Sequence, residues 1–415
     1  MSRVERMVIV GGGQCGARAA HALRANGWGG EITLIGNERA LPYERPPLSK
    51  SVLTRQSTTT DCSLYGEPFY KDQCIETRTG ANVVALDRLR KTIRLGDDQT
   101  VGFSKLLLAT GATPRMLRVP GCTLDGVHTL RTELDAEAIS RTLATGKRIA
   151  IIGAGFIGLE VAASAIARGC EVLVLEAAPR ALMRAVPRPV AERIVTLHRS
   201  MGVDFRFGTG TVRFVGDRAV RGVELKDGEL ITCDAVVVGI GVTPNTALAA
   251  EAGLDISDGI VVDAHLRTKD ESIFAAGDAC SFHHALFKQH MRLECWKNAN
   301  DHARIAALNM LGHHETVRDV PWFWSDHYDI TVQIAGVPSL GTSTVMREIG
   351  QSSCIYFALS ADGVLVGASG VGSLGDIAKD IRVAQELIAK QLRVPPVALM
   401  DRTVKLRSLL VEEKL

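Results

Sequence analysis

Two glycine-rich turns constrain this chain more than any other feature. Both have the spacing Gly-x-Gly-x-x-Gly, at Gly11–Gly16 and at Gly153–Gly158. Each follows a short apolar run, Met7–Val10 or Arg148–Ile152, and precedes a segment with helical apolar spacing. In such a turn the first glycine permits a tight bend, the second lets the backbone approach a pyrophosphate, and the third lets the helix pack on the strand. The repeat therefore predicts two nucleotide-binding βαβ units.

Further strands place these turns in an α/β fold with parallel sheets. Glu31–Ile35 closes the first βαβ unit and Glu171–Leu175 closes the second. Lys105–Ala109 and Ala235–Val238 are apolar runs that each end in another glycine turn. Strands that alternate with helices indicate parallel sheets, so we expect two Rossmann-type domains.

The pattern changes from about Pro321. Apolar residues there alternate with polar and aromatic ones, which predicts strands at Thr331–Ala335, Ser353–Leu359 and Val364–Ser369. A helix is expected near Ile377–Gln391. We interpret this segment as a separate α+β C-terminal domain.

The string Thr268-x-x-x-x-Ile-Phe-Ala-x-Gly-Asp278 is the most specific motif in the chain. It matches the second FAD fingerprint of glutathione-reductase-like flavoproteins, in which a strand delivers the aspartate to the ribityl chain. The order of the motifs indicates that the FAD-binding domain is split. We expect residues 1–114 and 246–320 to form it, 115–245 to form an inserted NAD-binding domain, and 321–415 to form the C-terminal domain.

Acidic residues after the second strand of each unit are candidates for binding a ribose. Glu176 directly follows its strand, and a carboxylate there repels a 2′-phosphate, so NADH is favoured over NADPH. Arg180 and Arg184 lie nearby and could instead favour a phosphate. In the first unit either Asn37 or Glu38 could bind the FAD ribose.

Four segments resemble one family. Pro42–Lys50, Ala109–Arg115, Gly158–Glu160 and Pro321–Asp326 are similar to the ferredoxin reductases of bacterial aromatic-ring dioxygenase and cytochrome P450 systems. The resemblance covers nearly the whole chain. It implies a glutathione-reductase-like fold, hydride transfer from NADH to FAD, and a [2Fe-2S] ferredoxin that feeds a terminal oxygenase. Which of the two kinds of oxygenase is served stays open.

The resemblance also implies site residues. Lys50 is expected beside the flavin, and Glu160 is expected to face the nicotinamide and pair with Lys50. Arg304 and Trp324 match positions near the exposed flavin edge and are candidates for docking the ferredoxin. The residues expected at FAD are Gly11, Gly13, Gln14, Cys15, Gly16, Asn37, Glu38, Arg45, Lys50, Val83, Ala109, Thr110, Gly111, Arg131, Asp278, Glu294, Cys295 and Trp296. The residues expected at NAD are Gly153, Gly155, Phe156, Ile157, Gly158, Glu160, Glu176, Arg184, Gly239, Ile240 and Gly241.

Two other functions share this kind of fold. A disulfide reductase or NADH oxidase needs a redox cysteine after the first βαβ unit, but Arg39–Ser51 contains none. Cys15, inside the first glycine turn, is interpreted as a small packing residue. A redox-sensing flavoprotein like apoptosis-inducing factor would need a basic face to bind nucleic acid, whereas the net charge is only +2.

Composition narrows the remaining expectations. Nine cysteines without a CxxC pair, and no signal-peptide core, indicate a reducing, cytoplasmic setting. No apolar stretch approaches the roughly 18 residues that span a bilayer. His283–His284 and His313–His314 are expected in surface loops, and no metal site, nucleic-acid partner or membrane is predicted. The choice between monomer and homodimer stays open.

Overall fold

A parallel sheet of five strands forms the centre of the first of two structural units. The computed structural model of the chain describes residues 5–350 and 352–410. The first unit comprises the chain up to residue 46, then 59–113 and 242–319; the second comprises 47–58, 114–241 and the chain from 320 onward. In the first unit the strand order is β19-β7-β1-β2-β3 and neighbouring strands are parallel. The bounds are β1 Arg6–Val10, β2 Glu31–Ile35, β3 Ile75–Arg78, β7 Lys105–Leu108 and β19 Ile273–Ala275.

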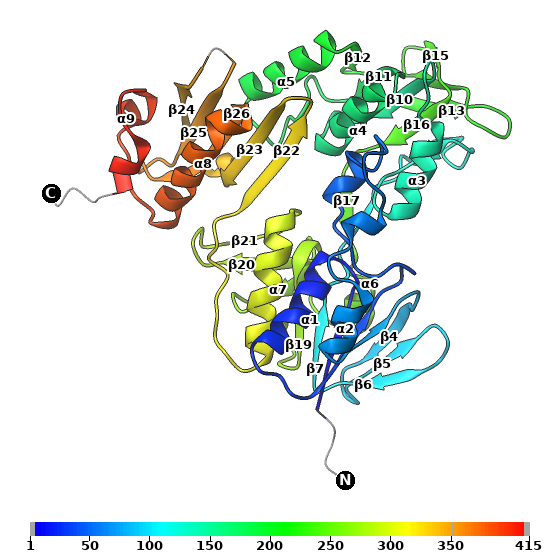
Figure 1. Ribbon diagram of the computed structural model, residues 1–415, viewed down its shortest axis with the longest axis vertical. Coiled ribbons are helices and arrows are strands. Elements are labelled where there is room, and N and C mark those ends of the chain that lie inside the picture. Colours follow the sequence, from blue (N-terminus) through cyan, green and yellow to red (C-terminus); the bar gives the residue numbers. More distant parts are fainter. Residues whose placement is uncertain (1–4, 351, 411–415) are drawn as a thin grey trace. The chain divides into compact units, whose positions relative to one another are not determined.

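Two helices of this unit run side by side (Figure 1). They are α1, Gln14–Ala25, and α7, Trp296–Met310. Both carry buried alanines, among them Ala20 on α1 and Ala303 on α7, and these small side chains let the helices approach closely. The strands below them are apolar and fully buried at Ile9 and Leu107. The sheet therefore holds the start of α1 in a fixed position.

Smaller elements complete the first unit. One antiparallel sheet contains β4 Val83–Asp87, β5 Thr92–Leu95 and β6 Thr100–Gly102. Another sheet contains β18 Ile260–Val262, β20 Cys280–His284 and β21 Gln289–Met291. The short helices are α2 Glu67–Asp72 and α6 Ala247–Glu251, and β8 Ala112–Pro114 pairs with β17 Val242–Pro244.

The second unit repeats the parallel architecture. Its five-stranded sheet has the order β12-β11-β10-β16-β9, again with parallel neighbours. The bounds are β9 Val127–His128, β10 Arg148–Ile152, β11 Glu171–Glu176, β12 Val203–Phe207 and β16 Ala235–Val238. The helices are α3 Glu133–Thr142, α4 Phe156–Ala167 and α5 Arg188–Ser200, and a three-stranded antiparallel sheet contains β13 Thr211–Val215, β14 Gly222–Leu225 and β15 Leu230–Thr232.

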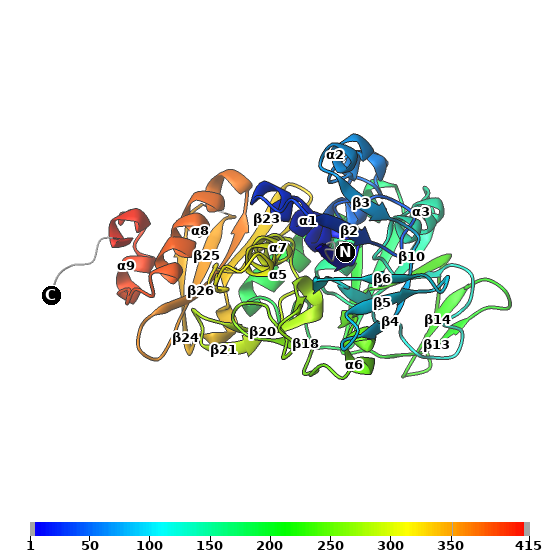
Figure 2. The same cartoon turned by 90° about the horizontal axis from the view of Figure 1, so that it is seen from below.

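An antiparallel sheet of five strands forms the rest of the second unit. Its order is β22-β23-β26-β25-β24, and α8, Leu374–Ala389, packs against it (Figure 2). The bounds are β22 Trp322–His327, β23 Ile330–Gly336, β24 Ser343–Glu348, β25 Cys354–Leu359 and β26 Leu365–Gly372, with α9 at Pro396–Met400. Strand β22 also contacts α4, and β26 contacts α5. This part of the chain therefore groups with the second parallel sheet, and the three-domain division stays a prediction.

The predicted α/β fold class is confirmed, with one local correction. His283 and His284 were expected in a surface loop, but they lie in β20, and His284 is fully buried. Its Nε2 lies 3.2 Å from the carbonyl oxygen of Asp319, so the buried imidazole keeps a partner. His313 and His314 are exposed after α7. Within residues 5–350 and 352–410, no helix is both long and apolar enough to cross a membrane.

Candidate functional site

The first glycine turn has one open position between two closed ones. Gly11 has φ +129°, and a side chain there would overlap the carbonyl oxygen of Ala109. A side chain on Gly16 would overlap the carbonyl oxygen of Gly11. A Cβ on Gly13 would meet nothing closer than Arg45 Nη2, at 4.0 Å. The turn is thus packed on its protein side and open where a phosphate would approach the start of α1.

The second glycine turn repeats this arrangement. Gly153 has φ +104°, and a Cβ there would lie 2.5 Å from the carbonyl oxygen of Gly239. A side chain on Gly158 would overlap the Gly153 carbonyl, whereas a Cβ on Gly155 has 3.9 Å to its nearest neighbour. In both turns the first glycine packs on the residue that follows the neighbouring strand, β7 or β16. Both turns therefore leave backbone space for one anionic group each.

Glu38 and Arg45 lie beside the first turn. The Glu38 carboxylate accepts hydrogen bonds from Arg45 Nη2 at 2.6 Å and from the Tyr43 hydroxyl at 2.5 Å. This ion pair fixes the guanidinium near Gly13, where it could neutralise a pyrophosphate. Asn37, the other candidate for the ribose, is exposed after β2.

The fingerprint motif folds into a strand and a tight turn. Strand β19 leads into a 3₁₀ turn at Gly277–Ala279 that contains Asp278. The Thr268 hydroxyl lies 3.0 Å from the carbonyl oxygen of Ile273 and braces the strand. The Gly277 N–H donates to His302 Nδ1 at 3.2 Å. These contacts hold the Asp278 carboxylate at the carboxyl end of the sheet, where a ligand hydroxyl could reach it.

Cys15 packs against this turn. A Cβ on Gly277 would lie 3.3 Å from Cys15 Cβ, and Cys15 is buried. Burial and, to a smaller extent, the charge of Asp278 raise the pKa of the Cys15 thiol. A protonated, buried thiol is a poor nucleophile, as suits a packing role.

The other residues expected at FAD fall in both units. Thr110 Oγ1 donates to the carbonyl of Asn245 at 2.7 Å, and Gly111 has φ +66°. Cys295 occupies the position directly before α7, and burial raises the pKa of its thiol to about 12. The remaining positions are Gln14 on α1 bonded to Asn300, Val83 at the start of β4, Glu294 paired with Arg292, and Trp296 at the start of α7. Lys50 and Arg131 belong to the second unit.

Glu176 contacts the second glycine turn. Its carboxylate accepts hydrogen bonds from the backbone N–H groups of Ala154 and Ala178, both at 2.7 Å. Arg180 donates to carbonyls of its own loop, including Met183 at 2.8 Å, whereas Arg184 is exposed. A carboxylate therefore lies where a ribose is expected, and one of the two nearby arginines is already engaged.

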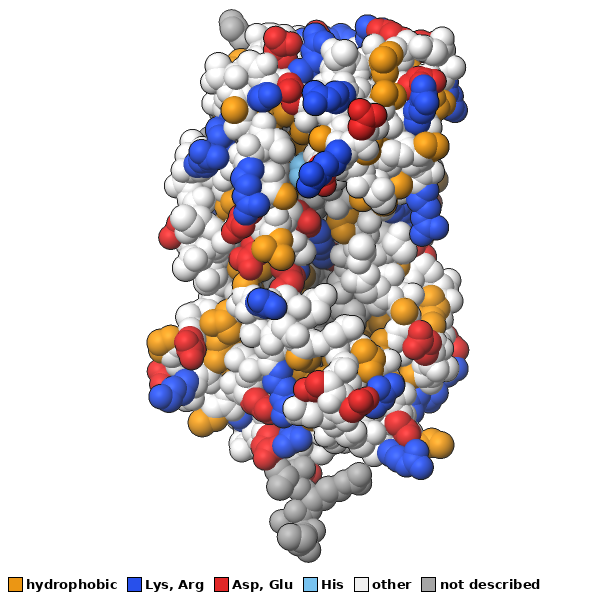
Figure 3. All heavy atoms as spheres, turned by 90° about the vertical axis from the view of Figure 1, so that its right-hand side faces the viewer, with side chains coloured by type: hydrophobic (Ala, Val, Ile, Leu, Met, Phe, Trp, Pro, Cys, Tyr) orange, Lys and Arg blue, Asp and Glu red, His pale blue; other side chains and the backbone are white. Residues whose placement is uncertain are grey.

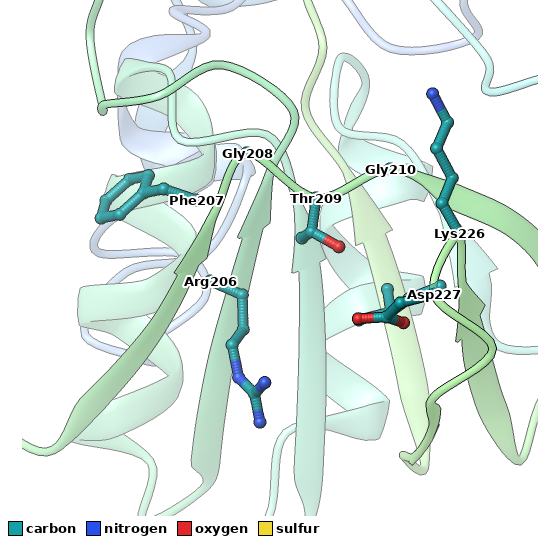
Figure 4. Close-up of a pocket in the computed structure, with 8 residues that line it drawn as sticks. Arg206, Phe207, Gly208, Thr209, Gly210, Lys226 and Asp227 are labelled. Carbon is teal, nitrogen blue, oxygen red and sulfur yellow. The ribbon is translucent and has the colours of Figure 1, made fainter.

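A shallow pocket lies at the same edge of this sheet (Figure 4). It has a volume of about 280 Å³ and includes the turn Gly208–Gly210, which follows β12. That turn is tied to the end of β11 by hydrogen bonds from Gly208 N to Ala178 O at 3.0 Å and from Thr209 N to Glu176 O at 3.2 Å. The lining residues are Arg206, Phe207, Gly208, Thr209, Gly210, Leu225, Lys226 and Asp227. The pocket thus adjoins Glu176.

Lys50 and Glu160 form an ion pair in the second unit, as the resemblance implied. Lys50 Nζ lies 3.3 Å from Glu160 Oε1 and 3.2 Å from Asp326 Oδ2. Glu160 on α4 is only 5% exposed, and it accepts hydrogen bonds from Ser49 Oγ at 2.5 Å and Ser325 Oγ at 2.6 Å. Burial raises the pKa of the Glu160 carboxyl, and Lys50 with the two hydroxyls opposes that shift.

Three of these partners were missed from the sequence. Asp326, Ser325 and Ser49 lie inside Pro321–Asp326 and Pro42–Lys50, two segments that resemble the ferredoxin reductases, but none of the three was predicted as a site residue. The signal was the alternation along β22, where Trp324 and Asp326 share one face and Ser325 points to the other. Lys50 Nζ also lies 5.5 Å from the centre of the Trp324 ring, so the ammonium faces an aromatic surface.

The remaining candidates are more loosely connected. Phe156 packs against Phe323, with ring centroids 4.6 Å apart, while Ile157 is 46% exposed at the start of α4. Arg304 is half exposed and pairs with Asp319 at 3.4 Å in the first unit. Ile240 and Gly241 lie between β16 and β17.

Within the described part of the chain, no cluster of three or more His, Cys, Asp and Glu residues is arranged to hold a metal ion.

Two glycine turns, the fingerprint motif and an ion pair between Lys50 and the buried Glu160 define an oxidoreductase of the two-nucleotide type. The chain belongs to the pyridine nucleotide-disulphide oxidoreductase family, whose model matches residues 5–303, and the reductase C-terminal model matches residues 322–410. It is 40% identical to the ferredoxin–NAD(+) reductase component of the anthranilate 1,2-dioxygenase system of Burkholderia cepacia, over 97% of this chain and 98% of that protein.

Solved structures agree with this assignment. The ferredoxin reductase for the CYP199A2 system from Rhodopseudomonas palustris is 36% identical, with a TM-score of 0.93 over 98% of this chain and 100% of that one. Putidaredoxin reductase in its covalent complex with putidaredoxin is 35% identical, also with a TM-score of 0.93, over 98% of each chain. The family inferred from the sequence is confirmed.

Proposed function

We propose that this chain is the NADH-dependent, FAD-containing ferredoxin reductase of an oxygenase system. The observation that carries the proposal is the pair of equivalent glycine turns combined with the Lys50–Glu160 ion pair. Relatives that match nearly the full length include the ferredoxin–NAD(+) reductase components of two dioxygenase systems. When bound, FAD accepts a hydride from NADH and releases the two electrons one at a time.

The first unit has the features needed to hold FAD. The start of α1 presents backbone N–H groups beside the open Gly13, and Arg45 adds a positive charge there. Asp278 would accept hydrogen bonds from ribityl hydroxyls. The Glu38 carboxylate already accepts hydrogen bonds from Arg45 and Tyr43. To bind the FAD ribose it would accept further hydrogen bonds and keep its ion pair with Arg45.

The second unit would bind NADH in the same manner. The turn at Gly153–Gly158 would take the pyrophosphate, and Glu176 would accept hydrogen bonds from the adenosine ribose. The negative charge of Glu176 would repel a 2′-phosphate, and Arg180 already donates hydrogen bonds to carbonyl groups of its own loop. The preference for NADH over NADPH follows from this arrangement.

Lys50 would act as the charged group of the reaction site. A positioned ammonium stabilises the negative charge that a flavin gains on accepting a hydride. Glu160 and Asp326 both contact this ammonium, at 3.3 Å and 3.2 Å. Glu160 would also face the nicotinamide and orient it.

The electron acceptor would be a [2Fe-2S] ferredoxin that serves a terminal oxygenase. Arg304 and Trp324 are proposed to contact it, since Arg304 is exposed and Trp324 lies beside Lys50. On the face in Figure 3 acidic and basic side chains are interspersed, which does not resemble a nucleic-acid-binding surface. A cytoplasmic location and either a monomeric or a homodimeric state belong to the same proposal.

A cysteine-dependent reaction is the alternative to exclude. Cys15, the cysteine inside the first glycine turn, is buried and its thiol has a raised pKa, and residues 39–51 contain no cysteine. An anaerobic titration separates the two mechanisms. FAD alone takes up two electrons, whereas FAD with a redox disulfide takes up four.

Reductase activity itself is tested by NADH-dependent cytochrome c reduction. The purified yellow protein is assayed with and without a [2Fe-2S] ferredoxin, and turnover is expected only when the ferredoxin is present. A colourless protein that cannot be reconstituted with FAD, or a rate that no ferredoxin increases, would contradict the proposal.

A further inference from the structure

A buried series of hydrogen bonds forms a chain that leads from Glu160 to side chains on the inner face of β22. Ser325 Oγ lies 2.6 Å from Glu160 Oε1 and 3.1 Å from His327 Nε2. Ser325 and His327 are two residues apart on one strand, so both point to the same face. Both are fully buried.

The chain continues through α5 to the turn after β22. His327 Nδ1 lies 3.2 Å from His198 Nε2, and His198 Nδ1 lies 3.3 Å from the Tyr328 hydroxyl. His198 is fully buried, whereas Tyr328 is partly exposed. Four successive contacts therefore connect a buried carboxylate with a side chain that reaches the surface, all within the second unit.

Both histidines are neutral in this environment. Burial lowers the pKa of His198 to about 4, and burial, with smaller contributions from the neighbouring His198 and Lys50, lowers that of His327 well below 6.5. A neutral imidazole has one donor nitrogen and one acceptor nitrogen, so each ring can pass a hydrogen bond from one neighbour to the next. Next to Glu160, at one end of these hydrogen bonds, the charged side chains are Lys50 and Asp326, which pair with each other.

The chain has two complete hydrogen-bonded states. When Glu160 is ionised, Tyr328 donates to His198, His198 to His327, His327 to Ser325, and Ser325 to Glu160. When Glu160 is protonated, every donor and acceptor exchanges roles, and Tyr328 donates to water. The two states differ by one proton, and neither leaves a buried polar atom without a partner.

We propose that Tyr328, His198, His327 and Ser325 form a proton path between solvent and Glu160. A hydronium ion in the solvent gives a proton to the Tyr328 oxygen and becomes water, and the proton that Tyr328 carried passes to His198 Nδ1. The Nε2 proton of His198 then passes to His327 Nδ1, that of His327 Nε2 to Ser325 Oγ, and the Ser325 proton to Glu160. One O–H or N–H bond breaks at each donor as one forms at each acceptor, and the net change is one proton gained by Glu160.

The path would let the reaction site adjust its charge. A carboxylate beside a group that becomes more negative gains a proton more readily, and a side chain that is 5% exposed needs a route for it. Lys50, whose ammonium contacts both Glu160 and Asp326, is the competing route, and the variants below distinguish the two. The inference rests on the proposed function only in placing Glu160 at the reaction site.

Time-resolved infrared spectroscopy of the FAD-loaded protein after a light-triggered drop in pH tests the path on the carboxyl group itself. The C=O stretch of protonated Glu160 is identified as the band that Glu160→Gln removes. We expect Tyr328→Phe and His198→Phe to slow the appearance of this band by about 100-fold, the effect typical of a positioned proton-transfer group. Tyr356→Phe removes another partly buried hydroxyl of the second unit and should leave the rate unchanged.

A further variant separates proton transfer from simple positioning. In His327→Gln the amide keeps a donor and an acceptor but cannot exchange its proton along the chain. In this variant the final intensity of the Glu160 band should equal that of the unmodified protein, whereas the band should still appear slowly. Rapid protonation of Glu160 in all three variants, Tyr328→Phe, His198→Phe and His327→Gln, would overturn the path and point to Lys50 as the route. Because the readout is a carboxyl band, it is independent of whether the protein reduces a ferredoxin.

Discussion

Lys50 lies between two carboxylates and an aromatic ring, and its charge is the feature of the reaction site that is simplest to remove. We expect Lys50→Ala to retain FAD but to slow flavin reduction by NADH by about 100-fold, because a preorganised charge is lost. Stopped-flow absorbance of the flavin measures this rate. Lys147→Ala, which removes an exposed lysine paired with Asp234 in the same unit, is the matched control. Equal rates for the two variants would exclude a role for the ammonium.

Glu176 is the residue that distinguishes the two coenzymes. We expect Glu176→Gln to improve the kcat/KM ratio for NADPH over NADH by roughly tenfold, or ~1.4 kcal/mol, because a charge repulsion is removed. Glu171→Gln, at the opposite end of the same strand and exposed, should not change the ratio. An unchanged ratio in Glu176→Gln would place the ribose elsewhere.

Buried neutral histidines make folding sensitive to acid. Burial lowers the pKa of His284 to about 4 and that of His302 to about 3. Because the unfolded chain binds these protons from about pH 6.5 downward and the folded chain does not, stability is full above pH 6.5 and falls as the pH drops toward 4. Thermal unfolding of His284→Gln should show a shallower loss over this window than the unmodified protein. Parallel curves would indicate that His284 is protonated in the folded state.

At the scale of the element, each glycine turn is specified by two residues that cannot carry a side chain, its first and its third glycine. We expect Gly153→Ala to keep FAD bound and lose reduction by NADH, since the new Cβ would press on the Gly239 carbonyl and the residue has a positive φ. The flavin spectrum reports the first property and stopped-flow reduction the second. Gly375→Ala, on α8 with open space around it, is the control. Normal reduction by NADH in Gly153→Ala would show that the turn can relax.

The elements that the sequence predicted well are those with a local signal. Apolar runs followed by spaced glycines indicated β1, α1, β10 and α4, because a strand, a tight turn and a packed helix each restrict nearby residues. Strand β22 was not predicted as a strand, since its two faces carry tryptophans, a serine and a histidine in place of a simple apolar alternation. Its inner side chains gain their partners, Glu160 and His198, from elements far away in the sequence. The burial of His284 depended in the same way on Asp319, a contact that no local pattern reveals.

At the scale of the whole molecule, association with an acidic ferredoxin would depend on a few exposed charges, because the net charge is only +2. We expect Arg304→Ala to raise the apparent KM for the ferredoxin about threefold at low salt, with a smaller effect at high salt because ions screen the interaction. Arg218→Ala, another exposed arginine, is the control. Cytochrome c reduction at several salt concentrations gives both values. An effect of Arg304→Ala that does not change with salt would argue against electrostatic docking.

Neither unit is built from one continuous stretch of chain, and this affects how the protein can be made. Strand β19 pairs with β7, although about 165 residues separate them in the sequence. The first sheet therefore lacks an edge strand until the ribosome has passed Ala275, and the second unit lacks β22 until it has passed His327. Most of the polypeptide must emerge before either unit can close, so a truncated product would expose unpaired strand edges and depend on chaperones.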